Sequence, residues 1–341
     1  METADKSTVQ EIFKNVYRII LPLAGNKPGP VNVYLITGKV VTLIDTGILK
    51  TADVLEKALS EIGITFSDIR QIILTHGHVD HFGAAKKIQA GSASHIDIAA
   101  SSEDLDLIKN GLEVPVRQLL KYYKNMGVPL IYKASLFLVS YVLKSLSEKC
   151  HVDRFLSDGD SITIGDYEAT VISTPGHTRG SICIFLKKEG ILFAGDHILE
   201  HITPNAFVML EPGKTMPDRL SQAEYYDSIT KIEKLSPRIT CPAHGRLIKD
   251  LHITTDMFRD QYKLRLKNII NILKEGENTA YRIGRKLFPN IDRKKLPLEI
   301  FLIISEVYSH MQILERDGFV KTRVIRGILY FRLNELQNFS E

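Results

Sequence analysis

The chain has 341 residues, of which 44% are hydrophobic and 25% are charged, and its formal net charge is +4 at pH 7. This composition is ordinary for a soluble globular protein, and the length exceeds that of one typical domain, so we expect two domains. No segment is long and apolar enough for a transmembrane helix, and residues 1–6 lack the apolar core of an export signal. The three scattered cysteines fit buried thiols in a reducing compartment, so we expect a cytoplasmic protein.

The first part of the chain predicts strands and helices in alternation. Residues 15–48 alternate between apolar and polar side chains in the manner of strands. Residues 51–62 have apolar side chains at helical spacing, and a further helix is expected at residues 83–90. Short apolar runs at residues 72–74 and 97–100 predict two buried strands.

The segment at residues 75–83 is dense in metal-ligand types of side chain. It places three histidines and one aspartate within six residues, namely His76, His78, Asp80 and His81. Imidazole and carboxylate groups at this density suit a borderline divalent cation such as zinc. A regular strand or helix could not direct all four at one ion, but a tight loop can divide them between two neighbouring ions. The sequence therefore predicts a metal site here.

Residues 101–150 depart from the alternating pattern and are largely helical in character. Within them, residues 131–143 are apolar on nearly all sides, yet too short and too interrupted by polar residues to span a bilayer. One interpretation is a helix buried against a neighbouring element or a second copy of the chain. The other is a lid over an apolar substrate pocket, because long insertions in enzymes often form lids.

Three later strand ends carry further ligand candidates. Each follows a short apolar run that ends in Gly or Pro: His177 after residues 169–172, Asp196 after 190–193 and His244 after 238–241. Loops at strand ends can converge while the strands stay rigid, and an α/β scaffold places its site residues there. The sequence therefore predicts that these side chains complete the site begun by the histidine-rich segment.

The residues from about 253 onward predict a separate small domain. Helical patterns cover residues 256–273, 279–288 and 297–316, and a hairpin is expected within residues 318–332. Three helices and a two-stranded wing resemble a winged helix-turn-helix. From Thr255 onward the chain has 16 basic and 11 acidic residues, so the excess positive charge lies here. A basic winged helix can bind nucleic acid, although winged folds also serve as dimer or pocket-wall modules.

With these motifs, the chain resembles the metallo-β-lactamase-fold hydrolase superfamily over roughly residues 10–250. The resemblance implies a mixed α/β fold: a four-layer αβ/βα sandwich at residues 1–252 that carries the helical insertion, and the winged-helix-like domain at residues 253–341. It also implies that His76, His78 and His177 hold one ion, that Asp80, His81 and His244 hold a second, and that Asp196 bridges both. The last histidine and the bridging aspartate resemble the glyoxalase II, lactonase and ribonuclease branches. Antibiotic-hydrolysing members commonly have a cysteine where this chain has Asp196.

The chemistry expected of such a site follows from its ligands. Two ions about 3.5–4 Å apart can share a water and lower its pKa, giving a bridging hydroxide nucleophile. Asp80 is the candidate to orient this hydroxide. We expect two divalent ions per chain, with zinc first and iron or manganese as alternatives. Asp45 either supports the ligands, by fixing a ligand loop or accepting a ligand N–H, or is a turn residue before Gly47.

Three classes of function fit these observations. The first is a small-molecule thioester or ester hydrolase acting on an acyl-CoA or glutathione thioester. The second is a metal-dependent endoribonuclease that holds RNA with the basic tail, and the third is a non-hydrolytic iron site or binding module. A thiolate leaves with little protonation, whereas a ribose alkoxide profits from a general acid, for which His197 and His201 are candidates.

We predict the first class, with the nuclease as the alternative. The apolar insertion favours an acyl substrate, and the basic tail could equally hold the phosphates of CoA. Asp80 and His197 are the predicted catalytic side chains, although His197 directly follows a ligand and also fits a pocket wall. A homo-oligomer remains open.

Overall fold

The computed structural model describes residues 8–23, 28–110, 116–132, 145–206, 216–217, 219–290 and 296–334. The apolar stretch predicted at residues 131–143 lies outside these residues from position 133 onward. Both interpretations of that stretch, a packed helix and a lid, therefore stay predictions.

Seven strands, β1 to β7, form the first sheet in chain order. Their bounds are Thr8–Phe13, Val16–Leu21, Val31–Ile36, Thr42–Ile44, Gln71–Ile73, Asp97–Ala100 and Arg154–Phe155. β1 to β4 pair antiparallel, and β4 to β7 pair parallel. Every residue of β3, β4 and β5 is buried, as expected where both faces of a sheet are covered. The strands predicted from the apolar runs of this region are confirmed.

Five strands form the second sheet, in the order β12-β11-β10-β9-β8. Their bounds from β8 to β12 are Ser161–Ile164, Tyr167–Ser173, Ile182–Leu186, Ile191–Gly195 and Ile239–Pro242. Neighbours pair antiparallel except β11 and β12, which run parallel. The carboxyl ends of β11 and β12 therefore lie at one edge, which brings the loops after them together.

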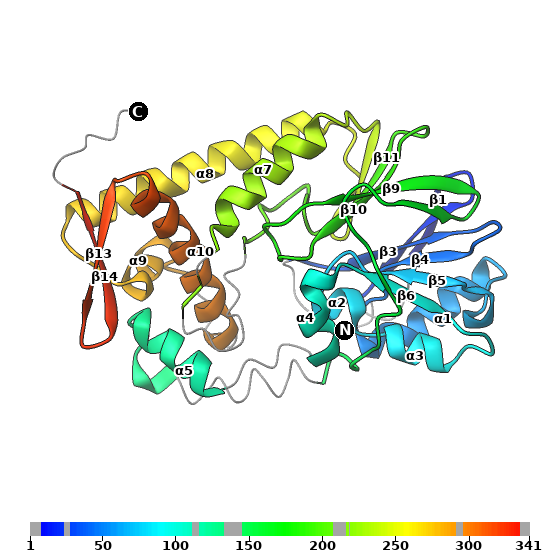
Figure 1. Ribbon diagram of the computed structural model, residues 1–341, viewed down its shortest axis with the longest axis horizontal. Helices are drawn as coiled ribbons and strands as arrows, with labels where there is room; N and C mark the ends of the chain where they lie inside the picture. The colour runs from blue at the N-terminus through cyan, green and yellow to red at the C-terminus, as the bar shows by residue number, and fades with distance from the viewer. Residues whose placement is uncertain are drawn as a thin grey trace. The chain divides into compact units, whose positions relative to one another are not determined.

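The two sheets pack face to face. Tyr34 and Ile73 of the first sheet share one buried cluster with Val171 and Phe193 of the second. A second cluster fills the other face of the first sheet, where α1 (Ala52–Glu61) and α3 (Ala85–Ala90) pack (Figure 1). α1 buries an apolar stripe at the spacing that the sequence predicted, and α3 lies within the helix expected at residues 83–90.

A helix also lies against the second sheet. α7 (Ser221–Glu233) places Ser228 so that its Oγ donates to the Pro175 carbonyl at 2.8 Å, and Lys231 Nζ donates to the Ser173 carbonyl at 3.1 Å. Helix, sheet, sheet and helix make the four-layer arrangement that the resemblance implied. α7 itself was not predicted.

The C-terminal residues form three helices and a hairpin. Their bounds are Leu251–Lys274 (α8), Ala280–Leu287 (α9), Leu296–Arg316 (α10), Val320–Ile325 (β13) and Ile328–Leu333 (β14). Thr279 caps α9 by accepting a hydrogen bond from Arg282 N. The hairpin turns at Arg326 and Gly327, both in the left-handed region. Helices and hairpin appear in the predicted order, and the winged-helix classification stays a prediction.

The chain divides into two compact units. Unit 1 comprises residues 1–113, 142–204 and 227–255, and unit 2 comprises residues 114–141, 205–226 and 256–341. Within unit 2, α5 (Val116–Asn125) buries Tyr122 and Tyr123 in one core with α9 and α10. The predicted boundary after residue 252 assigns these earlier segments to the first domain, and it too stays a prediction.

Two further expectations from the sequence concern membrane-spanning helices and the three cysteines. No helix among the described residues is long and apolar enough to cross a membrane. Cys150, Cys183 and Cys241 are all buried and unpaired, as predicted.

Candidate metal centre

The histidine-rich segment begins where β5 ends. His76 and His78 lie on a loop, and α2 (Val79–Phe82), a single helical turn, follows at once and carries Asp80 and His81. Gly77 between the two loop histidines is tightly enclosed, because a Cβ there would lie 2.6 Å from Leu107 Cβ. Loop and turn together point the four side chains in different directions, which a regular element could not do.

The three later candidates come from the second sheet. His177 follows β9, Asp196 directly follows β11 and His244 lies two residues after the end of β12. The pairing of β11 with β12 shifts register between Phe193 and Gly195, and Gly195 has a φ of +52°. A Cβ on Gly195 would lie 2.7 Å from Thr75 Oγ1, so this glycine lets the Asp196 loop approach the histidine-rich loop.

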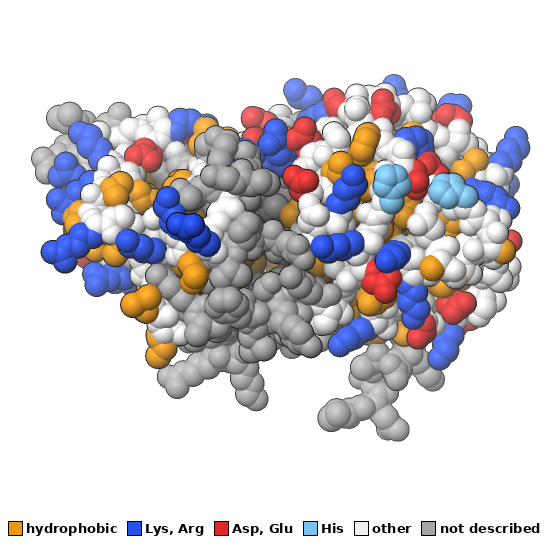
Figure 2. Space-filling view, turned by 60° about the horizontal axis from the view of Figure 1, so that its bottom comes forward, with side chains coloured by type: hydrophobic (Ala, Val, Ile, Leu, Met, Phe, Trp, Pro, Cys, Tyr) orange, Lys and Arg blue, Asp and Glu red, His pale blue; other side chains and the backbone are white. Residues whose placement is uncertain are grey.

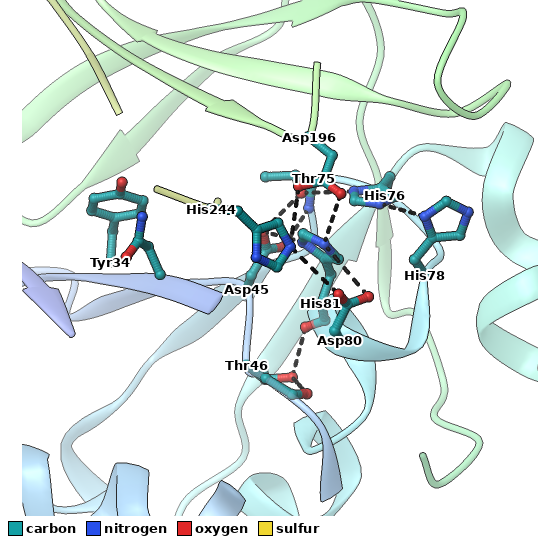
Figure 3. A network of polar contacts seen from close by, with 12 residues as sticks. Tyr34, Asp45, Thr46, Thr75, His76, His78, Asp80, His81, Asp196 and His244 are labelled. Atoms are coloured by element: carbon teal, nitrogen blue, oxygen red, sulfur yellow. Dashed lines mark hydrogen bonds and ion pairs between the residues drawn. The ribbon is translucent and has the colours of Figure 1, made fainter. Parts of the chain in front are cut away.

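The structure brings all seven predicted ligands together in two groups. The first consists of His76, His78, His177 and Asp196, and the second of Asp80, His81 and His244. Figure 3 shows Asp196 between the two sets of rings. Its Oδ2 lies 3.5 Å from His177 Nε2 and 3.6 Å from His81 Nε2, and its Oδ1 lies 3.5 Å from His244 Nε2. The carboxylate of Asp196 therefore faces both groups.

Several ligand atoms in this centre are buried without a hydrogen bond. Among the described residues, His81 Nε2, His244 Nε2 and Asp196 Oδ1 have no such partner. Buried polar atoms are normally paired, so atoms left over at one point call for an ion or a water. Two atoms bound about 2.1 Å from one tetrahedral ion lie about 3.4 Å apart. The separation of His244 Nε2 and Asp80 Oδ2 is 3.4 Å, so the residues present fit a metal.

The outer nitrogens of two second-group histidines are held by acceptors. His244 Nδ1 donates to the Pro30 carbonyl at 2.9 Å, and His81 Nδ1 donates to Asp45 Oδ2 at 2.8 Å. A donor at Nδ1 leaves the lone pair of Nε2 for the centre. This is the arrangement by which proteins orient metal-binding imidazoles.

Asp45 supports the second group through three hydrogen bonds. Besides the His81 ring, it accepts from Thr75 N and from Thr75 Oγ1, each at 2.8 Å. The residue is buried and has a φ of +60°, a conformation that aspartate tolerates better than most residues. The interpretation of Asp45 as a supporting residue is confirmed. The turn conformation that was the alternative is also present and places the carboxylate.

The ionisable groups of the centre shift in opposite directions. Burial and neighbouring histidines hold the pKa of His76 well below its usual value, and burial lowers the pKa of His78 to about 3. Burial would lower the pKa of His81 and of His244. Nearby carboxylates raise both values instead, with Asp45 the largest contributor at His81 and Asp196 the largest at His244. Neutral imidazole is the form that binds metal, so the lowered pKa of His76 and His78 favours the binding form, whereas His81 and His244 must release a proton before they bind an ion.

The carboxylates of the centre stay ionised despite their burial. Burial alone would raise the pKa of Asp80 and Asp196, but His81 and His244 beside them keep both below the usual value. Asp80 and Asp196 therefore favour the protonated form of the His81 and His244 rings. An entering cation would replace the protons of those histidines.

The two additional histidines occupy different surroundings. His197 is buried, with 1% of its surface exposed, and burial lowers its pKa to about 3. His201 is exposed, and its Nε2 lies 3.2 Å from the Pro28 carbonyl oxygen. Neither residue belongs to the two ligand groups found among the described residues.

One contact of this centre has no signal in the local sequence pattern. Asp104, at the end of a short 3-10 turn at Ser102–Asp104, accepts hydrogen bonds from Gly77 N and Thr178 Oγ1. In the sequence it is simply an acidic residue at the start of α4 (Leu105–Asn110). Only the folded chain brings it beside residues 27 and 74 positions away.

Comparison with known proteins agrees with this geometry. The family model described as the metallo-beta-lactamase superfamily matches residues 26–244. A probable metallo-hydrolase of Bacillus subtilis is 28% identical over 319 residues, which cover 89% of this chain and 93% of that protein. An atrochrysone carboxyl ACP thioesterase of Aspergillus fumigatus is 24% identical over 258 residues, which cover 75% of this chain and 47% of that protein.

A solved structure shares the fold. A metallo-beta-lactamase family protein of Thermus thermophilus superposes with a TM-score of 0.81 at 21% identity, covering 95% of this chain and 100% of that one. The family match spans more than half of the chain and includes every ligand candidate from His76 to His244. The chain therefore belongs to the metallo-beta-lactamase superfamily.

Proposed function

We propose that the protein is a binuclear metal-dependent hydrolase of a small-molecule thioester or ester. One observation carries this proposal: two adjoining groups of buried histidines and aspartates face a common carboxylate, Asp196. When bound, two divalent ions would activate a water as nucleophile and polarise the carbonyl under attack. Zinc is the first candidate, because nitrogen and oxygen ligands at these separations suit it.

The side chains of the centre divide the remaining work. Asp80, on the turn of α2, is more exposed than the other second-group ligands, so its carboxylate can both touch an ion and orient the attacking water. Asp45 and the carbonyls near Pro30 hold the second-group rings in place. The buried walls exclude bulk water, which strengthens every charge interaction inside.

The basicity of the leaving group distinguishes thioesters from oxyesters as substrates. A thiolate is a weak base and departs with little help, whereas an alkoxide needs a proton from a placed acid. His197 is the predicted donor, but its burial beside the centre equally suits a wall of the pocket. The name of the Aspergillus relative, an acyl carrier protein thioesterase, supports a thioester substrate for this chain.

A substrate screen tests the proposal. Protein loaded with zinc, iron or manganese is assayed against acyl-CoAs, acyl-glutathiones, lactones and a structured RNA. We expect metal-dependent thiol release from a thioester, absent in His76→Ala, which removes a first-group ligand. Arg70→Ala, which changes an exposed residue outside the centre, is the matched control and should keep full activity. Release of thiol that chelators and His76→Ala both leave unchanged would contradict the proposal.

A metal-dependent endoribonuclease is the second candidate. Lys321, Arg323 and Arg326 are exposed on the β13–β14 hairpin. On the face drawn in Figure 2, the part built from the C-terminal helices and hairpin carries Lys and Arg side chains with few carboxylates between them. Such charge favours phosphate binding. Metal-dependent RNA cleavage without thioester hydrolysis would make this the function.

A further inference from the structure

The first ligand group has a common support outside the ligands themselves. Asp104 is buried, with 1% of its surface exposed. Its Oδ2 accepts hydrogen bonds from Gly77 N at 2.8 Å and from Thr178 Oγ1 at 2.6 Å. Its Oδ1 accepts one from Gly180 N at 2.7 Å. One buried carboxylate thus accepts hydrogen bonds from two loops.

Those two loops carry every histidine of the first group. Gly77 lies between His76 and His78, and Thr178 directly follows His177. A Cβ on Gly180 would lie 2.6 Å from Asp104 N, and one on Gly77 would lie 3.2 Å from Asp104 Cβ. Both loops therefore close around the Asp104 turn with no room to spare.

The bonds to Asp104 tie together parts that are remote in sequence. The Gly77 loop follows β5 of the first sheet, and the Thr178 loop follows β9 of the second. Nothing in the pairing of strands joins these two loops, because the strands belong to different sheets. The Asp104 carboxylate hydrogen-bonds to both loops, in addition to the bond from Ile182 N to the Thr75 carbonyl at 2.9 Å.

A capping role is the ordinary alternative for an acidic residue in this position. Asp104 directly precedes α4, where aspartate often accepts from the first helical N–H groups. The contacts of its two oxygens go instead to the ligand loops. A cap would stabilise α4 and leave metal binding unaffected.

From this geometry we infer that Asp104 is a positioning residue that selectively holds the first ion site by fixing His76, His78 and His177 through their neighbours. The inference rests on the proposed metal centre and on no particular substrate. Removing the support should weaken the first ion by about 10- to 100-fold, as with other residues behind metal ligands. The second ion, whose rings Asp45 and backbone carbonyls hold, should bind as before.

Asp104→Asn is the sharpest substitution. An amide has one oxygen and one NH₂ group, and each position of the carboxylate faces a backbone N–H, from Gly77 or from Gly180. Either orientation of the amide therefore sets a donor against a donor, although the shape hardly changes. Asp153→Asn is the matched control, because Asp153 also accepts from a backbone N–H, that of Ile98, but lies away from the ligands.

The experiment measures ions retained per chain against rising chelator concentration, for full-length zinc-loaded protein. Asp104→Asn is made in the His244→Ala background, which keeps the first site, and in the His177→Ala background, which keeps the second. We expect loss of retention in the first background, none in the second, and none from Asp153→Asn in either. Equal loss in both backgrounds, or in neither, would overturn the inference.

A milder variant covers the case in which Asp104→Asn does not fold. Thr178→Val removes one of the three bonds and should weaken the first ion by about 2- to 10-fold, the effect of one ordinary hydrogen bond. Thr178→Ser keeps the hydroxyl and should restore wild-type retention. Equal retention by the Val and Ser variants would count against the inference. Wild-type protein without bound ions would overturn the metal centre as well, whereas two ions without thioester hydrolysis would overturn only the proposed substrate.

Discussion

The two ligand groups differ in how their charge is arranged. The first offers three imidazoles whose nitrogens crowd together, with His78 Nδ1 lying 3.0 Å from His76 Nε2 and 3.1 Å from His177 Nε2. The second has two imidazoles beside Asp80, and the ring of His81 also contacts Asp45. The imidazoles of the first group therefore contact one another, whereas those of the second group contact carboxylates.

Each group also has its own buried carboxylate behind it. Asp45 accepts three hydrogen bonds and contacts a ligand ring directly. Asp104 also accepts three, but they come from residues beside the ligands, namely the backbone N–H groups of Gly77 and Gly180 and the side chain of Thr178. The comparison teaches that the two ligand groups have separate supports. The Asp196 carboxylate faces both groups.

The largest effect is expected at that shared residue. Asp196→Ala removes the carboxylate that faces both groups, so both ions should be lost together and hydrolysis should fall by about a thousandfold or more. Elemental analysis and thiol-release assays check this, with exposed His201→Ala as control. Retention of one full ion would break the view of Asp196 as the common member.

An intermediate effect is expected behind the second group. Asp45→Asn places an NH₂ group against Thr75 N–H or against the Thr75 hydroxyl and His81 ring, so the second ion should bind about 10- to 100-fold more weakly. The first ion should stay. Chelator titration in the His177→Ala background reports on the second ion, and titration in the His244→Ala background reports on the first. A loss of ion retention confined to the first ion would reverse the assignment of Asp45 to the second group.

A smaller effect is expected next to the first group. His197→Gln should keep both ions and change thioester turnover by less than about tenfold, because a thiolate needs no acid. An oxyester of the same acyl group is the comparison substrate. A loss of about 10²- to 10⁴-fold on the oxyester alone would identify His197 as a general acid. Equal small losses on both would identify a pocket wall.

The smallest effect is expected outside both groups, on the hairpin. Replacing Lys321, Arg323 and Arg326 by Ala should leave thioester turnover unchanged, and RNA should bind weakly at physiological salt before and after. Arg323 is already paired with Glu277, which reduces the charge available to phosphates. Tight RNA binding whose log–log salt slope flattens by about 0.7 per lost contact would instead promote the nuclease.

The ligand candidates that the structure brings together could be found in the sequence because their types are dense and their positions follow strands. His76 to His81 lie within one segment, and His177, Asp196 and His244 each follow an apolar run, so local pattern was enough. Strands β1, β7, β8 and β10 and helix α7 were not predicted. In β10, for example, all five residues are apolar and buried, and so short a run has no periodicity that separates strand from helix.

Contacts between distant segments were beyond what the sequence could predict. Asp104 looks like any acidic residue near a helix start, and its partners are set by the meeting of two sheets. The packing of α5 against the C-terminal core could not be predicted from the sequence either. It depends on Tyr281 N donating to the Met126 carbonyl at 3.0 Å and on Thr279 packing against Gly127, contacts that follow from tertiary structure alone.

Asp45 has a consequence for how the protein tolerates change. Its backbone conformation, with φ at +60°, suits glycine, asparagine and aspartate, and others would cost about 1–2 kcal/mol. The three groups that donate hydrogen bonds to Asp45 require a carboxylate at that distance. Glycine has no side-chain acceptor, and the asparagine amide has only one acceptor oxygen. Backbone and side chain therefore select the same residue for unrelated reasons. In a saturation library position 45 should accept aspartate alone, so variants with an altered centre must arise at other positions.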